Sequence, residues 1–393
     1  MTPSIAAAVT GFNPATATAA YIDGLGTEAL ARAEAYTAGN HWLLLWALVS
    51  SALVTWLVVR TRVLDRLQAR VRSPNRQAFA VVLVAFALAA LLSLPWTLYA
   101  DWWREAGYGR TGQPVLDFLM QHAIGVAIST LLAAAFFVGV YALVRRAGRY
   151  WWLWSGGLFA VGASALLLLG PVLIEPLFND YRPVPEGEVR DAVVQLARQS
   201  GVPEDRVFVY DGSRQSNNFT ANVSGVLGSA RIAISDVAFR GASLDEVITV
   251  TGHEVGHYVL HHVWRTVGLL SLLAIALFFF VDRFFSRFAR AFGSKARLAD
   301  PAGVPVLVFM ATLFIAIATP LLNANTRIGE READRYSLQT TNRPDALASA
   351  LVKTAEYRYA RPHPLQEALF YTHPSVERRV RAAMEWKAAH PPK

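Results

Sequence analysis

The chain has 393 residues, of which 54% are hydrophobic and 17% are charged, and its mean hydropathy is +0.31. This composition is too apolar for an ordinary soluble domain or a disordered chain, so it indicates a membrane protein. The sequence contains no cysteine, which excludes disulfides, thiolate metal ligands and thiol nucleophiles, and its net charge of +8 is not accompanied by any DNA- or RNA-binding motif.

Six apolar segments predict membrane-spanning helices, because a hydrocarbon core of roughly 30 Å requires about 20 residues of helix. The N-terminal stretch before them lacks a basic leader followed by an apolar core and a cleavage site, so we expect no cleaved signal peptide. Tryptophan and tyrosine gather at the segment ends, where we expect them to anchor the helices among lipid headgroups. The six segments are residues 41–59, 78–100, 124–144, 151–177, 267–281 and 304–322.

Two stretches outside the spans are polar enough to be water-soluble. Residues 186–201 have the periodicity of a helix that ends at a glycine, and residues 206–210 and 230–235 are typical of strands. Ser243 and Glu246 form a capping-box pattern that begins another helix. We therefore predict a mostly α-helical polytopic membrane protein with a small α/β domain. Its regions are residues 1–177 with four spans, 178–262 as the soluble α/β part, 263–322 as a two-span hairpin, and 323–393 as a polar, mostly helical end.

The sequence HEVGH, which begins at His253, predicts a metal site on the capped helix. His253 and His257 stand four residues apart, so both imidazoles lie on one helix face about 6 Å apart along the axis and can hold one zinc ion. Glu254 points beside the metal, where it can take a proton from the attacking water. Such a pattern arises by chance in on the order of one chain in a hundred. The capped helix and the small Gly252 and Gly256, which allow close approach, favour a functional site.

A catalytic zinc ion takes three protein ligands and keeps one position open for water. Residues 325–339, which follow the last span, carry the acids Glu330, Glu332 and Asp334. On a helix, Glu330 and Asp334 share a face while Glu332 points away from them. One acid of this region can therefore bind zinc while its neighbour supports the site. The residues alone leave open the alternative of a solvated charged face among arginines.

Three further histidines lie at span ends. His261 and His262 follow the motif at the entrance to a span, where we expect interfacial polar residues rather than extra metal ligands. His122 lies beside the third span, and we expect a hydrogen-bonded polar residue there rather than a proton relay.

Taken together, the motifs resemble a known family. The chain has, in order, the segment HEVGH, two spans, EREAD at residues 330–334 and HPSVERRV at residues 373–380. This order of segments is similar to that of the M48 metallopeptidases, specifically the membrane-embedded Ste24 type, the CAAX prenyl proteases. The similarity extends upstream to SLPWTLYADW at residues 93–102 and IEPLFNDYRPVPEGEV at residues 174–189. It thus covers nearly the whole chain. The resemblance implies a zincin-like metalloprotease domain, one zinc ion per chain and endopeptidase activity.

The resemblance also implies roles for individual residues. Glu330 would be the third zinc ligand beside the two motif histidines, and Glu254 would be the general base. Asp334 would have a supporting or proton-donating role, and His373 would stabilise the oxyanion of the tetrahedral intermediate. From the residues alone, the alternative for His373 is a structural turn residue before a helix. The family aligns its substrate with an Asn-Ala-aromatic segment, but this chain departs from that pattern and offers Asn217, Asn218 and Asn222 without a unique register.

The leading prediction is a zinc endopeptidase of a bacterial inner membrane, acting on CAAX-type prenylated substrates or on membrane and misfolded polypeptides, with no nucleic-acid partner. A site-2-type intramembrane protease buries HExxH in a span, whereas Asp245 and Glu246 begin this helix and no N-P-x-x-x-x-L-D-G-like segment supplies an aspartate ligand. A transporter or a catalytically dead scaffold would leave the spacing of His253, His257 and Glu330 unexplained.

The basic loops predict an orientation. Under the positive-inside rule, the loops after the first, third and fifth spans lie in the cytoplasm, which puts both termini and the protease region outside. The family resemblance implies the opposite, because eukaryotic Ste24-type enzymes have one more N-terminal span and a cytosolic catalytic region. The basic residues of these loops are Arg60, Arg62, Arg66, Arg70, Arg72, Arg76, Arg145, Arg146, Arg149, Arg283, Arg287, Arg290, Lys295 and Arg297.

Overall fold

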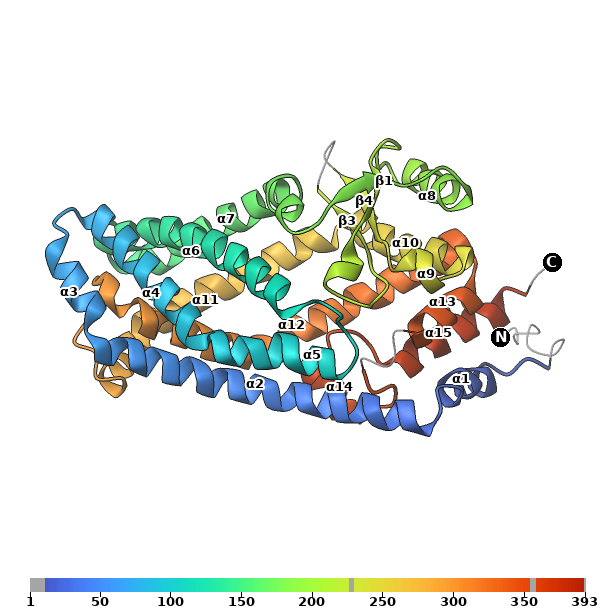
Figure 1. Ribbon diagram of the computed structural model, residues 1–393, viewed down its shortest axis with the longest axis horizontal. Helices are drawn as coiled ribbons and strands as arrows, with labels where there is room; N and C mark the ends of the chain where they lie inside the picture. Colours follow the sequence, from blue (N-terminus) through green and yellow to red (C-terminus); the bar gives the residue numbers. More distant parts are fainter. Residues whose placement is uncertain (1–10, 226–229, 354–357, 392–393) are drawn as a thin grey trace, which may run out of the picture.

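This computed structural model describes residues 11–225, 230–353 and 358–391; residues 1–10 and 392–393 of the expected terminal regions lie outside the described part. Long helices run along the long axis of the molecule, and a small sheet with its own helices lies toward one end (Figure 1). Among the described residues, six helices are long and apolar enough to cross a membrane, which confirms the predicted number. The spanning helices are α2 (Thr27–Thr61), α4 (Pro74–Thr97), α6 (Val115–Arg146), α7 (Trp151–Leu173), α11 (His262–Ala291) and α12 (Val304–Thr341).

Most of these helices are longer than the apolar segments that predicted them. α2 begins at Thr27, and α12 continues without interruption to Thr341, so the predicted border between residues 322 and 323 falls inside one helix. The first half of α12 is a span and its second half carries the acidic segment. α7 is shorter than predicted. It ends at Leu173, and Glu175–Leu177 form a single 3-10 turn, because Pro176 has no N–H with which to continue the helix.

The arginine-rich loops meet at the end of the bundle that lies away from the sheet (Figure 1). There α3 (Val63–Arg70) contacts the turn before α12, with the Ala302 N–H donating to Gln68 Oε1 at 2.8 Å. Arg145, at the end of α6, donates to Asn75 Oδ1 at 2.8 Å. At the opposite end, α4 passes through a π-helical turn (Leu98–Trp103) into α5 (Arg104–Gly107).

The soluble part contains a four-stranded sheet in the order β1-β2-β4-β3. β2 and β4 are parallel and coincide with the two predicted strands, while the pairings of β1 with β2 and of β3 with β4 are antiparallel. Ile232 and Ile234 of β4 are fully buried against Val193 and Val247 of the covering helices. The elements are β1 (Tyr181–Pro183), α8 (Glu188–Gln199), β2 (Val207–Tyr210), β3 (Ala221–Ser224), β4 (Arg231–Ser235), α9 (Ala238–Gly241) and α10 (Leu244–Val259).

The two ends of the chain share a third cluster of buried side chains. Ile22 of the first helix packs with Leu347, Val380 and Met384 from the C-terminal helices, and each of these side chains is almost fully buried. This cluster fixes the C-terminal helices against the end of α12. Its helices are α1 (Pro14–Asp23), α13 (Pro344–Lys353), α14 (Pro364–Phe370) and α15 (Val376–Ala389).

Candidate active site

Helix α10 begins at the predicted capping box. Ser243 Oγ accepts from the Glu246 N–H at 3.2 Å, and the Ser243 N–H donates to Glu246 Oε2 at 2.7 Å. The Glu246 carboxylate also accepts from Ser349 at 2.6 Å and from Lys353 at 2.7 Å. Burial raises the pKa of Glu246, but these hydrogen bonds outweigh burial and hold the pKa below its ordinary value. The start of the motif helix is thereby tied to α13.

Two glycines let α10 approach α12 closely. A Cβ atom at Gly256 would lie 3.1 Å from Tyr336 Cβ and 3.2 Å from Ala333 Cα, and one at Gly252 would lie 3.2 Å from Ser337 Oγ. Both glycines therefore sit where a larger residue would push the helices apart. The close packing brings the HEVGH segment next to the acids of α12.

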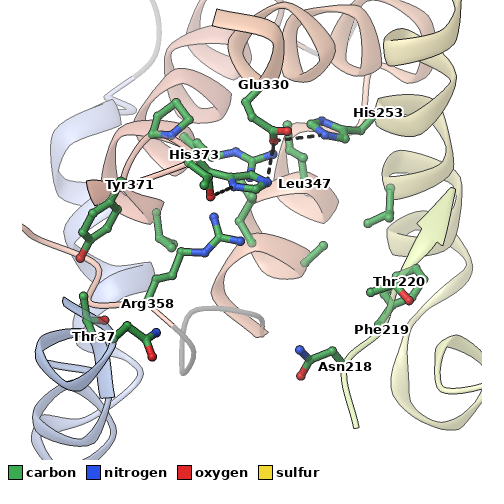
Figure 2. A pocket seen from close by; sticks show the side chains of 18 of the residues that line it. Thr37, Asn218, Phe219, Thr220, His253, Glu330, Leu347, Arg358, Tyr371 and His373 are labelled. Carbon is green, nitrogen blue, oxygen red and sulfur yellow. Dashed lines mark hydrogen bonds and ion pairs between the residues drawn. The ribbon is translucent and has the colours of Figure 1, made fainter. Parts of the chain in front are cut away.

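His253, His257 and Glu330 converge on one point, and Figure 2 shows His253 and Glu330 facing each other. The two Nε2 atoms are 3.1 Å apart, and they lie 3.4 Å and 3.3 Å from the nearer Glu330 oxygens. Zinc bonds of about 2.0–2.1 Å in a tetrahedral arrangement place neighbouring ligand atoms about 3.3 Å apart. The spacing and the N,N,O donor set therefore fit one zinc ion. No other group of three histidine or carboxylate ligands converges in this way among the described residues.

The three acids of α12 are arranged as the helical periodicity predicts. Glu330 and Asp334 are each about 5% exposed and face α10. Glu332 points to the other side, where its half-exposed carboxylate accepts from Arg265 at 2.8 Å. Only the Glu330 and Asp334 face therefore reaches the motif histidines.

Asp334 lies behind His253. The Nδ1 atom of His253 is 2.9 Å from Asp334 Oδ1, and the Arg379 guanidinium binds both oxygens of the same carboxylate at 2.7 and 2.6 Å. A carboxylate at Nδ1 favours the tautomer that carries its hydrogen there and leaves Nε2 free for a metal. Asp334 thus orients the His253 ring from the side opposite to its Nε2 atom.

His262 has the corresponding position behind His257, which corrects our expectation of an interfacial residue. His261 adopts a left-handed backbone with φ of 57°, and this turn brings His262 back against the motif. The Nδ1 atoms of His262 and His257 are 2.9 Å apart, and His262 Nε2 lies 2.9 Å from Glu332 Oε2. His262 is buried, whereas His261 is exposed.

Two of the three converging residues, His253 and Glu330, line a cavity of about 490 Å³, together with Glu254 and His373. Burial raises the pKa of Glu254, which strengthens its carboxylate as a base. Burial, together with the charge of Arg358, lowers the pKa of His373 to about 3, so its imidazole is neutral at neutral pH. Its Nδ1 lies 2.8 Å from the Thr372 hydroxyl, which leaves the Nε2 hydrogen directed toward Glu330, 3.2 Å away.

The three candidate asparagines differ in position. Asn218 lines the cavity, and its buried Oδ1 has no hydrogen-bond partner in the described part of the chain (Figure 2). Asn217 donates to the Gly109 carbonyl at 2.9 Å, and Asn222 lies on β3 opposite Ala233. Asn218 is therefore the one of the three that lines this cavity.

His122 lies in a different cavity, of about 410 Å³, that Asp101 and Gln121 also line. Its ring stacks on Phe118 with 6.0 Å between centroids, and the hydrogen bond that we expected for it is not found among the described residues. The side chain does not approach the converging ligands.

Sequence reasoning gave no role to Arg379 and Arg358 and assigned His262 to the membrane interface instead of to this site. Arg379 lies within the HPSVERRV segment that already pointed to His373, so the motif contained a signal for it. His262 could not be placed because its position depends on the left-handed turn at His261. Arg358 belongs to no motif, and only the fold brings it into the cavity.

Comparison with known proteins identifies the family. Residues 183–387, more than half of the chain, match the sequence model of peptidase family M48. The chain belongs to peptidase family M48. Residues 14–180 match a second model, described as CAAX prenyl protease N-terminal, five membrane helices; in this M48 chain that region holds four of the six candidate spans. The protein is a metallopeptidase of the Ste24 type and an integral membrane protein, as the motifs predicted.

Individual proteins that are similar to this M48 chain support the same family assignment. An uncharacterized metalloprotease of Bacillus subtilis is 26% identical over 349 residues, which cover 87% of this chain and 80% of that protein. CAAX prenyl protease 1 of Saccharomyces cerevisiae is 28% identical over 326 residues, covering 75% and 69%. The crystal structure of S. mikatae Ste24p superimposes with a TM-score of 0.76 over 95% of both chains at 19% identity, which shows the same fold.

Proposed function

We propose that this M48 enzyme is a zinc endopeptidase with His253, His257 and Glu330 as its metal ligands. The observation that carries the proposal is the convergence of two imidazole nitrogens and one carboxylate at the spacing of a tetrahedral zinc site. Imidazole donors suit zinc, whereas magnesium and calcium take oxygen ligands. The set of three ligands leaves a fourth position for the reacting groups.

The side chains around this position divide the remaining chemistry between them. A zinc ion held there supplies Lewis acidity toward the attacking water and the scissile carbonyl. Glu254 takes the proton from the water and then gives it to the leaving amine. His373 donates its Nε2 hydrogen to the carbonyl oxygen as negative charge develops on it. Asp334, fixed by Arg379, keeps His253 in the tautomer that presents Nε2.

We further propose that the substrates are peptide segments of membrane-associated proteins, either CAAX-type prenylated chains or misfolded membrane polypeptides, in a bacterial inner membrane. What supports this is the composition of the cavity wall. The spanning helix α2 contributes Thr37, Asn40, His41 and Leu44 to the same cavity as Glu254. A chain that emerges from the bilayer along α2 therefore reaches the zinc position directly.

The test uses the purified full-length protein in detergent with a peptide library read by mass spectrometry. The chelator-stripped protein is expected to lose cleavage and to regain it when one equivalent of zinc is added. Pairs of peptides with and without a farnesyl group show whether the lipid contributes to kcat/KM. Equal cleavage by the stripped and zinc-loaded protein would contradict the proposal.

A further inference from the structure

The positive charge of the chain is concentrated at the end of the bundle that lies away from the sheet (Figure 1). The loops there, residues 60–76, 145–149 and 282–300, contain 14 basic residues and 3 acids, a net charge of +11. The rest of the chain has 23 basic residues and 26 acids, a net charge of −3. This basic end, as we call these three loops, therefore accounts for the whole positive net charge of the protein.

The fold neutralises few of the cations at the basic end. Each of the three acids contacts one arginine close to it in sequence, with 3.4 Å or more between nitrogen and oxygen. Exposed ion pairs of this kind contribute little to stability. In the part of the chain that the structure describes, the other eleven basic residues pair with no carboxylate. The pairs are Arg62 with Asp65, Arg283 with Asp282 and Arg297 with Asp300.

Two of these arginines lie at the same end of one helix pair. α7 and α11 pack against each other and run antiparallel. At the basic end of this pair the Trp152 ring meets the Phe279 ring, with 5.3 Å between centroids. Arg149 comes three residues before Trp152, and Arg283 comes four residues after Phe279. Both arginines therefore lie just beyond this ring contact, at a place that we call the α7–α11 junction.

Both arginines of the junction lie over exposed aromatic rings. The guanidinium carbon of Arg149 is 4.7 Å from the centroid of the Tyr150 ring, and that of Arg283 is 5.0 Å from the centroid of the Phe279 ring. Tyr150 is 48% exposed and Phe279 is 42% exposed. Exposed aromatic rings beside cations at the end of a spanning helix are typical of the headgroup level of a bilayer. The two guanidinium groups are thus placed among lipid headgroups.

The adjacent surface of α7 is apolar and uncovered. α7 is the least buried of the six candidate spans, with 11% of its most apolar window buried against 17% or more in the other five. Leu153 and Trp154, which lie about one turn further into the span than Tyr150, are both exposed. A lipid whose headgroup meets the arginines can therefore lay a hydrocarbon chain along α7.

We propose that the α7–α11 junction binds an anionic phospholipid, with its phosphate between Arg149 and Arg283 and an acyl chain along α7. A guanidinium offers two parallel N–H donors that match two phosphate oxygens. The net charge of +11 at the basic end selects a headgroup with a net negative charge over a zwitterionic one. The lipid bridges α7 and α11, so its binding stabilises the folded protein. The proposal depends neither on the peptidase function nor on which side of the membrane the basic end faces.

The experiment titrates phosphatidylglycerol or phosphatidylcholine with the same acyl chains into the full-length protein in detergent. Native mass spectrometry measures the bound lipid, and the thermal midpoint of unfolding gives a second readout. We expect phosphatidylglycerol to bind at least about tenfold more tightly, because each arginine at a lipid surface contributes severalfold in affinity. Phosphatidylglycerol should also raise the unfolding midpoint more than phosphatidylcholine does.

Three double variants locate the site. Arg149→Gln with Arg283→Gln is expected to lower the preference for phosphatidylglycerol about tenfold. The corresponding double change to lysine should keep part of the preference, because the charge remains. Arg66→Gln with Arg70→Gln is the matched control: it removes the same charge from exposed positions of the same basic end, on α3, and should keep the preference. Unfolding without added lipid and zinc content are measured for each variant to exclude loss of the fold.

Four outcomes would count against the proposal. Equal affinities of the parent chain for the two lipids would overturn it. An equal loss of preference in the α3 control would overturn the assignment to the α7–α11 junction. Displacement of the lipid by inorganic phosphate in about tenfold excess would show a site for free anions instead of a phospholipid. If the glutamine variant fails to fold, the parent chain still decides, because the preference must weaken when salt rises from about 0.1 M to about 1 M. A preference unaffected by salt would contradict the role of the arginines.

Discussion

The Nδ1 atom of His253 lies 2.9 Å from the carboxylate of Asp334, so each residue determines what the other can do. The aspartate fixes the orientation of the imidazole, and the imidazole occupies an oxygen that Arg379 also binds. Such outer partners of a metal ligand raise its basicity and hold its ring in place. Under the proposed ligand assignment, Asp334 is a positioning residue, and its replacement is expected to change the metal affinity.

Asp334→Asn is expected to weaken zinc binding by about tenfold to a hundredfold, because the amide no longer offers two acceptors to His253 and Arg379. Competition with a chromophoric chelator measures the affinity. Asp345→Asn serves as the control, since Asp345 pairs with Lys387 at the surface, away from the motif. Equal affinities for the two variants would exclude the positioning role.

Glu330→Ala is expected to lose bound zinc, whereas Glu332→Ala is expected to retain it at close to one equivalent. The reason is that Glu330 faces both motif histidines and Glu332 faces Arg265 and His262 on the outer side. Elemental analysis of the purified variants gives the zinc content. The reverse result would show that the ligand has been assigned to the wrong face of α12.

His262→Ala is expected to lower zinc affinity by about tenfold, the lower end of the range for partners behind a metal ligand, because His257 loses the partner of its Nδ1 atom. Competition with a chromophoric chelator measures the zinc affinity of this variant as well. His261→Asn is a suitable control, since asparagine tolerates the left-handed backbone at that position. If the control weakened binding as much as His262→Ala, the effect would come from the turn instead of the imidazole.

The sequence was informative where a local pattern determines the structure. The capping box at Ser243, the shared face of Glu330 and Asp334, and the six spans all follow from periodicity and composition. The positions of Arg358 and His262 depend on a long-range contact and on a single left-handed residue, which no periodicity records. The length of α12 was also missed, because its polar second half carries no apolar signal for a continuing span.

The orientation in the membrane gives a fourth prediction. The arginine-rich loops lie at the end of the bundle away from the proposed zinc site (Figure 1), so the positive-inside rule puts the site outside the cytoplasm. A single cysteine at the exposed position of Arg66 should resist a membrane-impermeant maleimide on intact cells, and one at Ala388 should react. The chain has no native cysteine to interfere. The opposite labelling would place the site in the cytoplasm and would show that the arginine-rich loops do not mark the cytoplasmic side of the membrane.

The measurement that tests the central claim most directly is zinc content together with peptide cleavage in the Glu254→Gln variant. The amide keeps the size of the side chain but cannot accept the proton of the attacking water. The variant is expected to bind one equivalent of zinc, as the parent chain does, while kcat falls by at least about a hundredfold. Near-normal turnover in a fully zinc-loaded Glu254→Gln protein would contradict the account.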